Sequence, residues 1–162
     1  MIVAIVSDTH LPRAGRTFPD RCVELMESAE LILHAGDFID PIVLAEMEIL
    51  GPPVKGVQGN IDLPELQREL PAELELELEG TRLAMLHDAG PSPGRLVRMR
   101  RRFPNADALV FGHSHIPILE EHDGFQIFNP GSPTDKRRAP RHTMGLARVE
   151  DGRISFEHVD LD

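Results

Sequence analysis

The sequence is poor in several residue types that mark specialised protein classes. It has no tryptophan, no tyrosine and one cysteine among 162 residues. A single cysteine excludes an internal disulfide framework, and scarce aromatic side chains leave few platforms for stacking nucleic-acid bases. Cys22 lies beside Val23, Leu25 and Met26, and this spacing favours a buried, inert thiol on a helix face over a reactive one.

Long apolar runs and a basic leader are also missing. No stretch approaches the roughly 20 apolar residues that a membrane helix needs. The first ten residues, MIVAIVSDTH, do not have the basic start of a signal peptide. Together with the lack of disulfides, these features predict a cytoplasmic protein without a membrane partner.

Positive charge is in the minority, with 17 Lys and Arg against 27 Asp and Glu and a formal net charge of −10. This balance argues against general binding to a phosphate backbone, so no stable nucleic-acid binding is expected. It does not exclude a small phosphate substrate, because bound metal ions would reverse the local sign of the charge.

What the chain does contain is enough apolar sequence, 41% of residues, for a proper core, and its length predicts a single domain over residues 1–162. In the first half, short apolar runs alternate with stretches of helical spacing. The expected strands are 2–6, 31–33 and 54–57, and the expected helices are 18–29 and 41–50. This alternation predicts a parallel sheet with helical crossovers.

The second half has a different pattern. Residues 73–79 alternate Glu with Leu, as expected for a strand with one wet face, and Asp123-Gly124 and Asp151-Gly152 are hairpin signals. Further strands are expected at 82–86, 108–111, 116–122, 125–128, 143–149 and 153–159, and a helix at 92–103. A mostly parallel first half and a mostly antiparallel second half predict an α/β fold of two packed sheets with helices outside.

Metal-ligand residue types follow several of these strands. They are Asp8, His10, Asp37, Asn60, His87, His113 and His115. A spacing of two places the paired ligands on one side of an extended backbone, and the glycines before Asp37 and Asn60 allow tight turns. Each piece alone is weak, because Gly-Asp and Gly-Asn are common turn dipeptides. The ordered set predicts a metal site where the strands end.

The ordered motifs D-x-H, G-D, G-N, H and G-H-x-H, across residues 8–115, resemble the calcineurin-like metallophosphoesterase superfamily. The run Asn129-Pro130-Gly131-Ser132 and the short chain resemble its compact YfcE/MJ0936-type phosphodiesterase branch. The resemblance implies a four-layer αββα sandwich, with two mixed β-sheets flanked by helices. It also implies one ion held by Asp8, His10, Asp37 and His115, and a second held by Asp37, Asn60, His87 and His113.

By this resemblance Asp37 would bridge the two ions, and all seven residues would act in catalysis through the metals. A bridging carboxylate can hold two ions ~3.5–4 Å apart, and a hydroxide between them is a nucleophile at neutral pH. The expected activity is therefore hydrolysis of small phosphoesters. The ligand set suits Mn²⁺ as the first choice, with Fe, Zn²⁺ or Ni²⁺ as alternatives.

Three positions depart from the family pattern or leave a role open. Ile61 stands where larger members place a histidine, which supports the compact branch and leaves no obvious protein acid for the leaving group. The family's H-G-H is His87-Asp88-Ala89 here, so Asp88 either adds a carboxylate to the site or bonds a nearby amide or arginine. His34 either orients Asp37 or is a plain residue at a strand end.

Two basic clusters are open as well. Arg95, Arg98 and Arg102 share a helix face, which favours a solvated surface. The loop Lys136–Arg141 either leans over the metals and grips a second phosphate substituent, or is an exposed loop or an oligomer contact. A homo-oligomer is one of the open states.

Two other functions compete with the hydrolase. One is a non-catalytic VPS29-like protein-interaction module, which the complete ligand set disfavours. The other is an Mre11-type nuclease, which the missing histidine after Asn60, the short chain and the net charge disfavour.

Overall fold

A computed structural model describes all 162 residues and contains two five-stranded sheets. The first has the order β10-β9-β1-β2-β3, with β1 (Ile2–Val6), β2 (Leu31–His34), β3 (Val54–Gly56), β9 (Thr143–Glu150) and β10 (Arg153–Asp160). The second has the order β4-β5-β6-β8-β7, with β4 (Glu73–Leu78), β5 (Thr81–Leu86), β6 (Ala108–Val110), β7 (Ile118–His122) and β8 (Phe125–Asn129).

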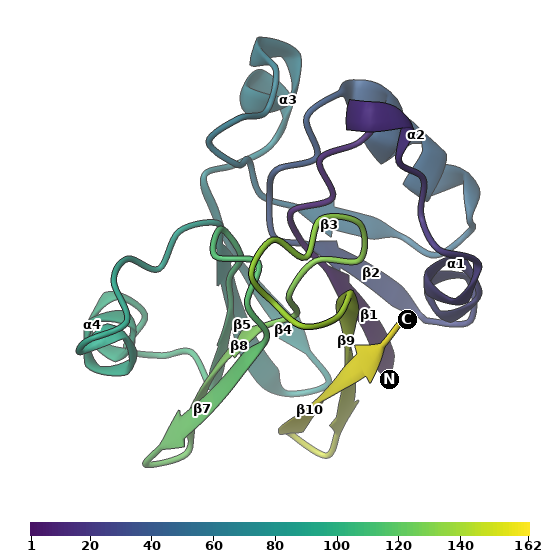
Figure 1. Ribbon diagram of the computed structural model, residues 1–162. Coiled ribbons are helices and arrows are strands. Elements are labelled where there is room, and N and C mark those ends of the chain that lie inside the picture. Colours follow the sequence, from purple (N-terminus) through teal and green to yellow (C-terminus); the bar gives the residue numbers. More distant parts are fainter.

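Helices cover the outer face of each sheet. They are α1 (Asp20–Glu27), α2 (Pro41–Ile49), α3 (Pro64–Glu69) and α4 (Arg95–Arg102), with a 3₁₀ turn, η1, at Arg13–Gly15. Figure 1 shows α1 and α2 beside the first sheet and α4 on the far side of the second. The predicted four-layer αββα sandwich is therefore confirmed. The expected start of α2 is also confirmed, because Asp40 accepts a hydrogen bond from the Ile42 amide at 3.0 Å and Pro41 follows it.

The expected split into a parallel first half and an antiparallel second half is only partly right. Strands β1, β2 and β3 are parallel, but the second half is mixed, because β5, β6 and β8 also pair in parallel. The hairpin of β9 and β10 returns to the first sheet and pairs antiparallel with β1. The reason lies in β9, which buries Ala147 and Val149 between the sheets and Met144 under the helices. A strand with two apolar faces needs cover on both sides, and the place beside β1 provides it.

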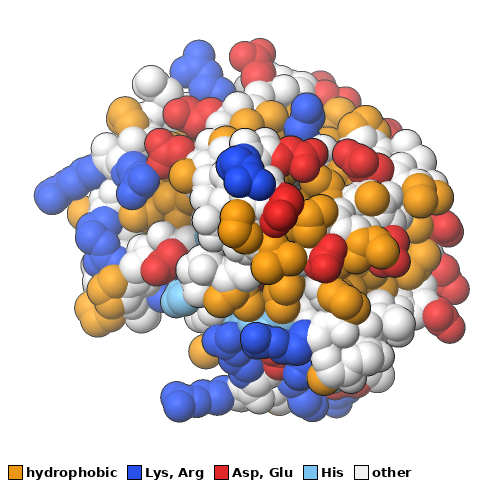
Figure 2. Space-filling model, turned by 90° about the horizontal axis from the view of Figure 1, so that it is seen from above, with side chains coloured by type: hydrophobic (Ala, Val, Ile, Leu, Met, Phe, Trp, Pro, Cys, Tyr) orange, Lys and Arg blue, Asp and Glu red, His pale blue; other side chains and the backbone are white.

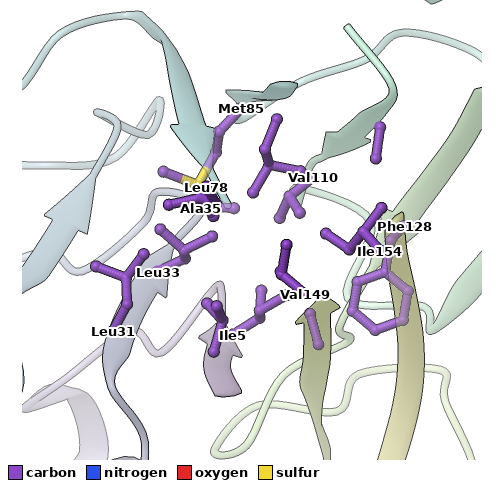
Figure 3. Packing of buried hydrophobic residues seen from close by; sticks show 14 of the residues in the cluster. Ile5, Leu31, Leu33, Ala35, Leu78, Met85, Val110, Phe128, Val149 and Ile154 are labelled. Atoms are coloured by element: carbon purple, nitrogen blue, oxygen red, sulfur yellow. The ribbon is translucent and has the colours of Figure 1, made fainter. Parts of the chain in front are cut away.

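The central core lies between the two sheets. Ile5 and Leu33 of the first sheet meet Met85 and Val110 of the second (Figure 3). Two further apolar clusters lie outside, under α1 and α2 and under α4. Cys22 is fully buried in the first of these, as its neighbours predict.

Two short helical elements have no counterpart in the sequence prediction, α3 and η1. Six residues of α3 bury a single side chain, Leu66, so no apolar period identifies the helix in advance. No helix in the structure has both the length and the apolar character needed to cross a membrane.

Candidate metal centre

Loops at the carboxyl ends of five strands carry the seven candidate ligands and bring them together. The loop after β1 carries Asp8 and His10, and those after β2, β3, β5 and β6 carry Asp37, Asn60, His87 and the pair His113 and His115. Two sets of three have ligand atoms that all lie within 4.8 Å of one another, and both include Asp8. They are Asp8, His10 and His115, and Asp8, Asp37 and His87.

The backbone at the two pairs of ligands spaced by two residues is left-handed rather than extended. Asp8 and His10 have φ angles of 54° and 49°, and His113 and His115 have 69° and 60°. The expected pairing of side chains at a spacing of two is present, but the extended backbone offered as its reason is wrong. Non-glycine residues adopt this region at a cost of about 1–2 kcal/mol each, and surrounding contacts hold them there.

Three glycines leave room for the ligands. A β-carbon on Gly36 would fall 2.7 Å from His87 Nδ1, and one on Gly112 would fall 2.7 Å from Asp8 Oδ2. At Gly59 it would fall 2.1 Å from the amide nitrogen of Asp37. Gly36 has the left-handed φ of 92° expected of a tight turn before Asp37, and the close packing at all three glycines excludes any side chain.

We call Asp8, His10 and His115 the first half of the site. Within it, two buried ligand atoms face each other without a hydrogen-bond partner. They are Asp8 Oδ1 and His115 Nε2, which lie 3.3 Å apart. His115 Nδ1 bonds the backbone carbonyl of Asp135, which only accepts, so His115 Nε2 carries a lone pair. Two facing lone pairs in a buried place are costly, and a divalent ion would satisfy both. The residues therefore fit a metal ion.

Asn60, His87 and His113 lie together and form the second half of the site. His87 Nδ1 donates to the Ala35 carbonyl at 2.7 Å, which leaves Nε2 facing the site. Asn60 Oδ1 lies 3.0 Å from His87 Nε2 and 3.1 Å from His113 Nδ1. Asp37 Oδ2 lies 3.3 Å from the Nε2 atoms of both His10 and His87, so this oxygen faces both halves of the site.

Burial and charge shift the pKa values of these groups. Burial raises the pKa of Asp8. Burial opposes ionisation of Asp37 too, but hydrogen bonds with His10 and His87 outweigh it and hold its pKa far below the ordinary range. At His87 burial opposes the charged form, yet the bond to Asp37 and the charge of Asp8 raise its pKa to about 9. Without a metal, the carboxylates and His87 thus stabilise each other as ion pairs.

The roles left open for His34 and Asp88 now have structural answers. His34 accepts from the Gly36 amide at 3.2 Å and its other nitrogen lies 3.0 Å from Thr9 Oγ1, so it braces the turn and forms no hydrogen bond with the Asp37 side chain. Burial lowers its pKa well below the ordinary value. Asp88 accepts from the Gly90 amide at 2.8 Å, and its other oxygen lies 4.0 Å from His113 Nε2.

The Asn129–Ser132 run ties two ligand loops together. Asn129 Nδ2 donates to the Gly112 carbonyl at 2.9 Å, and Ser132 Oγ donates to the Asp8 carbonyl at 2.8 Å. These bonds join the loop after β1 to the loop after β6. Since they act on backbone carbonyls, the motif shapes the site without supplying a ligand.

Sequence reasoning missed two carboxylates beside the site. Asp62 accepts from the Ile39 amide at 2.7 Å and from the Gly59 amide at 2.6 Å, which clamps the loops of Asp37 and Asn60. Asp135 Oδ2 lies 3.1 Å from His10 Nδ1 and 3.1 Å from Arg16 Nη1. A signal for Asp135 exists, because it is the one carboxylate in the Pro-rich basic stretch 129–141.

Most arginines of α4 are engaged in the fold, rather than forming a merely solvated face. Arg98 donates to the carbonyls of Pro91 and Pro93, both at 2.6 Å, and Arg95 lies over the Phe111 ring. In the basic loop, by contrast, Arg137 and Arg138 are exposed and form no ion pair. Figure 2 shows histidine atoms reaching the surface beside a group of Lys and Arg side chains.

Comparisons with known proteins agree on one family. Residues 1–152 match the model of the calcineurin-like phosphoesterase superfamily domain. A protein of Methanothermobacter thermautotrophicus named "Probable metallophosphoesterase" is 34% identical over 98% of this chain and 92% of its own length. One of Methanocaldococcus jannaschii named "Phosphodiesterase MJ0936" is 28% identical over 81% of this chain and 83% of its own length.

A solved structure shows the same fold at lower identity. The Vps29 protein of Entamoeba histolytica, described as complexed with Zn²⁺, superposes with a TM-score of 0.79 at 20% identity and covers 100% of both chains.

Proposed function

The chain belongs to the calcineurin-like phosphoesterase superfamily, and we propose that it is a metal-dependent phosphodiesterase that hydrolyses small phosphoesters at a dinuclear centre. The observation that carries this proposal is the pair of facing, unpaired atoms Asp8 Oδ1 and His115 Nε2, buried where the five ligand loops converge. The relative named a phosphodiesterase supports the reaction class.

Seven side chains would hold two divalent ions. The first would be held by Asp8, His10, Asp37 and His115, and the second by Asp37, Asn60, His87 and His113. When bound, the ions would activate a water molecule as the nucleophile and draw charge from the phosphoryl oxygens. Asp37 is proposed as the bridge because its Oδ2 lies 3.3 Å from a histidine nitrogen of each half.

The protein's own residues fix this arrangement in advance. His87 is oriented by the Ala35 carbonyl and His115 by the Asp135 carbonyl, so both rings point Nε2 into the site. The backbone amide of Ile61 donates to Asp37 Oδ1 at 3.1 Å and holds this carboxylate in place. The ligand side chains would therefore need little rearrangement when the ions and the substrate bind.

Substrate approach is proposed from the side of Asn60 and His113. These two residues are exposed, whereas His10 and His115 have exposed fractions of 1% and 0%. Ile61 stands where larger members of the family place a histidine and leaves no obvious protein acid for the leaving group, so substrates with good leaving groups are expected to react fastest.

Mn²⁺ is the proposed ion, with Fe, Zn²⁺ and Ni²⁺ as alternatives. Carboxylate, amide and imidazole ligands without thiolate accept all four, so loading would depend on availability as well as on affinity.

The second candidate is a protein-interaction module without catalysis. The fold likeness to Vps29 favours it, and exposed apolar side chains at Ile116 and Leu119 would suit a protein partner. It predicts less than one tightly bound ion per chain and no hydrolysis.

The deciding experiment measures hydrolysis of bis(p-nitrophenyl) phosphate after addition of Mn²⁺, together with the metal content of the protein. We expect activity in the wild type and its loss in Asp37→Asn and in His87→Ala. His122→Ala is the matched control, because His122 is exposed on β7 at the far edge of the second sheet. Full activity in either site variant would refute the assignment, and metal-free, inactive wild type would favour the interaction module.

A further inference from the structure

Asp135 contacts both histidines of the first half of the site from behind. Its carboxylate Oδ2 lies 3.1 Å from His10 Nδ1, and its backbone carbonyl accepts the bond from His115 Nδ1. On the opposite sides of the rings, His10 Nε2 lies 3.3 Å from Asp37 Oδ2 and His115 Nε2 lies 3.3 Å from Asp8 Oδ1. One residue thus holds two rings with their ligand nitrogens facing the carboxylates.

Asp135 is itself held from two directions, through its backbone amide and through its carboxylate. Its backbone amide donates to Ser132 Oγ at 2.8 Å, the same hydroxyl that donates to the Asp8 carbonyl. Arg16 Nη1, from the loop after η1, lies 3.1 Å from Asp135 Oδ2. Asp135 is therefore fixed relative to both the loop after β1 and the Asn129–Ser132 run.

An acceptor behind a histidine sets which nitrogen carries the proton. Since the Asp135 carboxylate accepts from His10 Nδ1, a neutral His10 ring has its lone pair on Nε2, on the side of Asp37. The His115 ring follows the same rule through the Asp135 carbonyl. The two rings pack edge to face with centroids 4.7 Å apart, so a turn of one ring would disturb the other.

The second half of the site does not depend on Asp135. His87 is oriented by the Ala35 carbonyl at 2.7 Å, and the nearest carboxylate to His113 Nε2, Asp88, is 4.0 Å away. The two halves also differ in exposure, because the His113 side chain is 47% exposed and that of His115 is fully buried. Loss of the Asp135 carboxylate should therefore affect one half and spare the other.

We propose that Asp135 is a positioning residue that orients His10 and His115 and so preforms one of the two metal subsites. The inference rests on the proposed metal-dependent function, but its test needs no substrate. The carboxylate is removed in Asp135→Ala and replaced by a neutral acceptor in Asp135→Asn, whose amide oxygen still reaches His10. Asp160→Ala is the control. It breaks the ion pair, at 2.9 Å, between Asp160 of β10 and Arg141, which lies in the same loop as Asp135, and Asp160 forms no hydrogen bond or ion pair with a candidate ligand.

Two measurements on metal-free protein decide the question. Titration with MnCl₂ by calorimetry should show that Asp135→Ala weakens one binding site about 10–100-fold and changes the other less than about twofold. Nitrogen-15 NMR of the histidine rings should show a single His10 tautomer in the wild type and a mixture in Asp135→Ala. Asp135→Asn should keep the tautomer and lose less than about tenfold in affinity, and Asp160→Ala should match the wild type.

The outcomes separate this inference from the proposed activity. Unchanged Mn²⁺ binding and an unchanged His10 tautomer in Asp135→Ala would overturn the positioning role, even in an enzyme that hydrolyses phosphodiesters. Conversely, the wild type could fail to hydrolyse the diester while Asp135→Ala still loses Mn²⁺ affinity at one site only. That result would refute the activity and support the positioning role. Should Asp135→Ala lack a cooperative melting transition, Asp135→Asn decides: full wild-type affinity together with a mixed tautomer would contradict the proposal.

Discussion

Gly59 lies so close to Asp37 that a β-carbon on residue 59 would fall 2.1 Å from both the amide nitrogen and Oδ1 of Asp37. Real β-carbons do not approach this closely, so Gly59→Ala must displace the backbone of one ligand loop. We expect Mn²⁺ binding to be lost and the free energy of unfolding to fall by about 1–3 kcal/mol. Calorimetric titration and denaturant unfolding measure the two effects.

The control for this change is Gly124→Ala in the turn between β7 and β8. A β-carbon there meets nothing within 4 Å, although the φ angle of 74° imposes backbone strain. It should cost about 1–2 kcal/mol in stability and leave Mn²⁺ binding unchanged. Normal Mn²⁺ binding by Gly59→Ala would show that the loops adjust more easily than their packing implies.

Asp62 clamps two ligand loops, and its removal should loosen both. Asp62→Ala leaves the Ile39 and Gly59 amides, which it binds at 2.7 and 2.6 Å, without an acceptor. Unsatisfied buried amides cost about 1–3 kcal/mol each, so we expect a loss of roughly 2–4 kcal/mol in unfolding free energy. Mn²⁺ affinity should fall with it, because Asp37 and Asn60 lie on the clamped loops.

Asp62→Asn should lie between the wild type and Asp62→Ala, since its one oxygen can serve one amide. Denaturant unfolding of the three proteins tests this order. Asp160→Ala, which removes an exposed ion pair with Arg141 and an exposed hydrogen bond from the Asp162 amide, should change stability by less than about 1 kcal/mol. Equal stability of Asp62→Ala and the wild type would mean that other groups satisfy the two amides.

Local patterns in the sequence predict most of the secondary structure. The alternation of Glu and Leu over residues 73–79 identifies β4, whose Glu75 and Glu77 are exposed while Leu74 and Leu76 pack against the core. The placement of β9 could not be predicted in the same way. Its pairing with β1 joins residues far apart in the chain and depends on which sheet covers its two apolar faces.

The candidate ligands could be located from sequence because strand ends and glycines mark them. Their conformation could not, since the left-handed φ of Asp8 and His10 is held by bonds from distant residues such as Ser132 and Thr134. The same holds for Asp62 and Asp135. Their importance follows from amides and rings that the fold brings to them, and no motif encodes those partners.

Cys22 should be inert toward alkylation in the folded protein. Burial raises the pKa of its thiol from the ordinary value of 9.0 to about 12. The reactive thiolate is therefore almost absent at pH 9, where about half of an unfolded thiol is ionised. Iodoacetamide labelling at pH 9, followed by mass spectrometry, should be at least about a hundredfold slower for folded protein than for protein in guanidinium.

The same pKa shift predicts how stability responds to alkali. Because the folded thiol keeps its proton longer than the unfolded one, unfolding releases a proton between pH 9 and about 12. The contribution of Cys22 is thus complete below pH 9 and declines as pH rises through that window. A Cys22→Ala variant removes the titration, so its stability should fall less steeply from pH 9 to pH 10.5. Parallel curves for the two proteins would show that folding does not raise the pKa of Cys22.

Arg137 is expected to assist substrates that carry a second negative group. It is exposed and without an ion pair, and its charge acts on the site: burial lowers the pKa of His115, and Arg137 adds to that effect. A single exposed charge near a bound anion contributes about 0.5–1 kcal/mol, so Arg137→Ala should raise KM for a dinucleotide with an internal pyrophosphate roughly 2–5-fold. The rise should shrink in high salt, because exposed charges are screened.

The matched control is Arg153→Ala, which removes the same charge from β10, where Arg153 is also exposed. Steady-state kinetics of both variants should be compared on the dinucleotide and on bis(p-nitrophenyl) phosphate, which has a single negative charge. We expect KM for the singly charged diester to change less than about twofold in Arg137→Ala, and neither KM to change in Arg153→Ala. Equal effects of Arg137 and Arg153 would mean that the basic loop acts only through net charge, and no effect of either would place Arg137 outside the reach of the substrate.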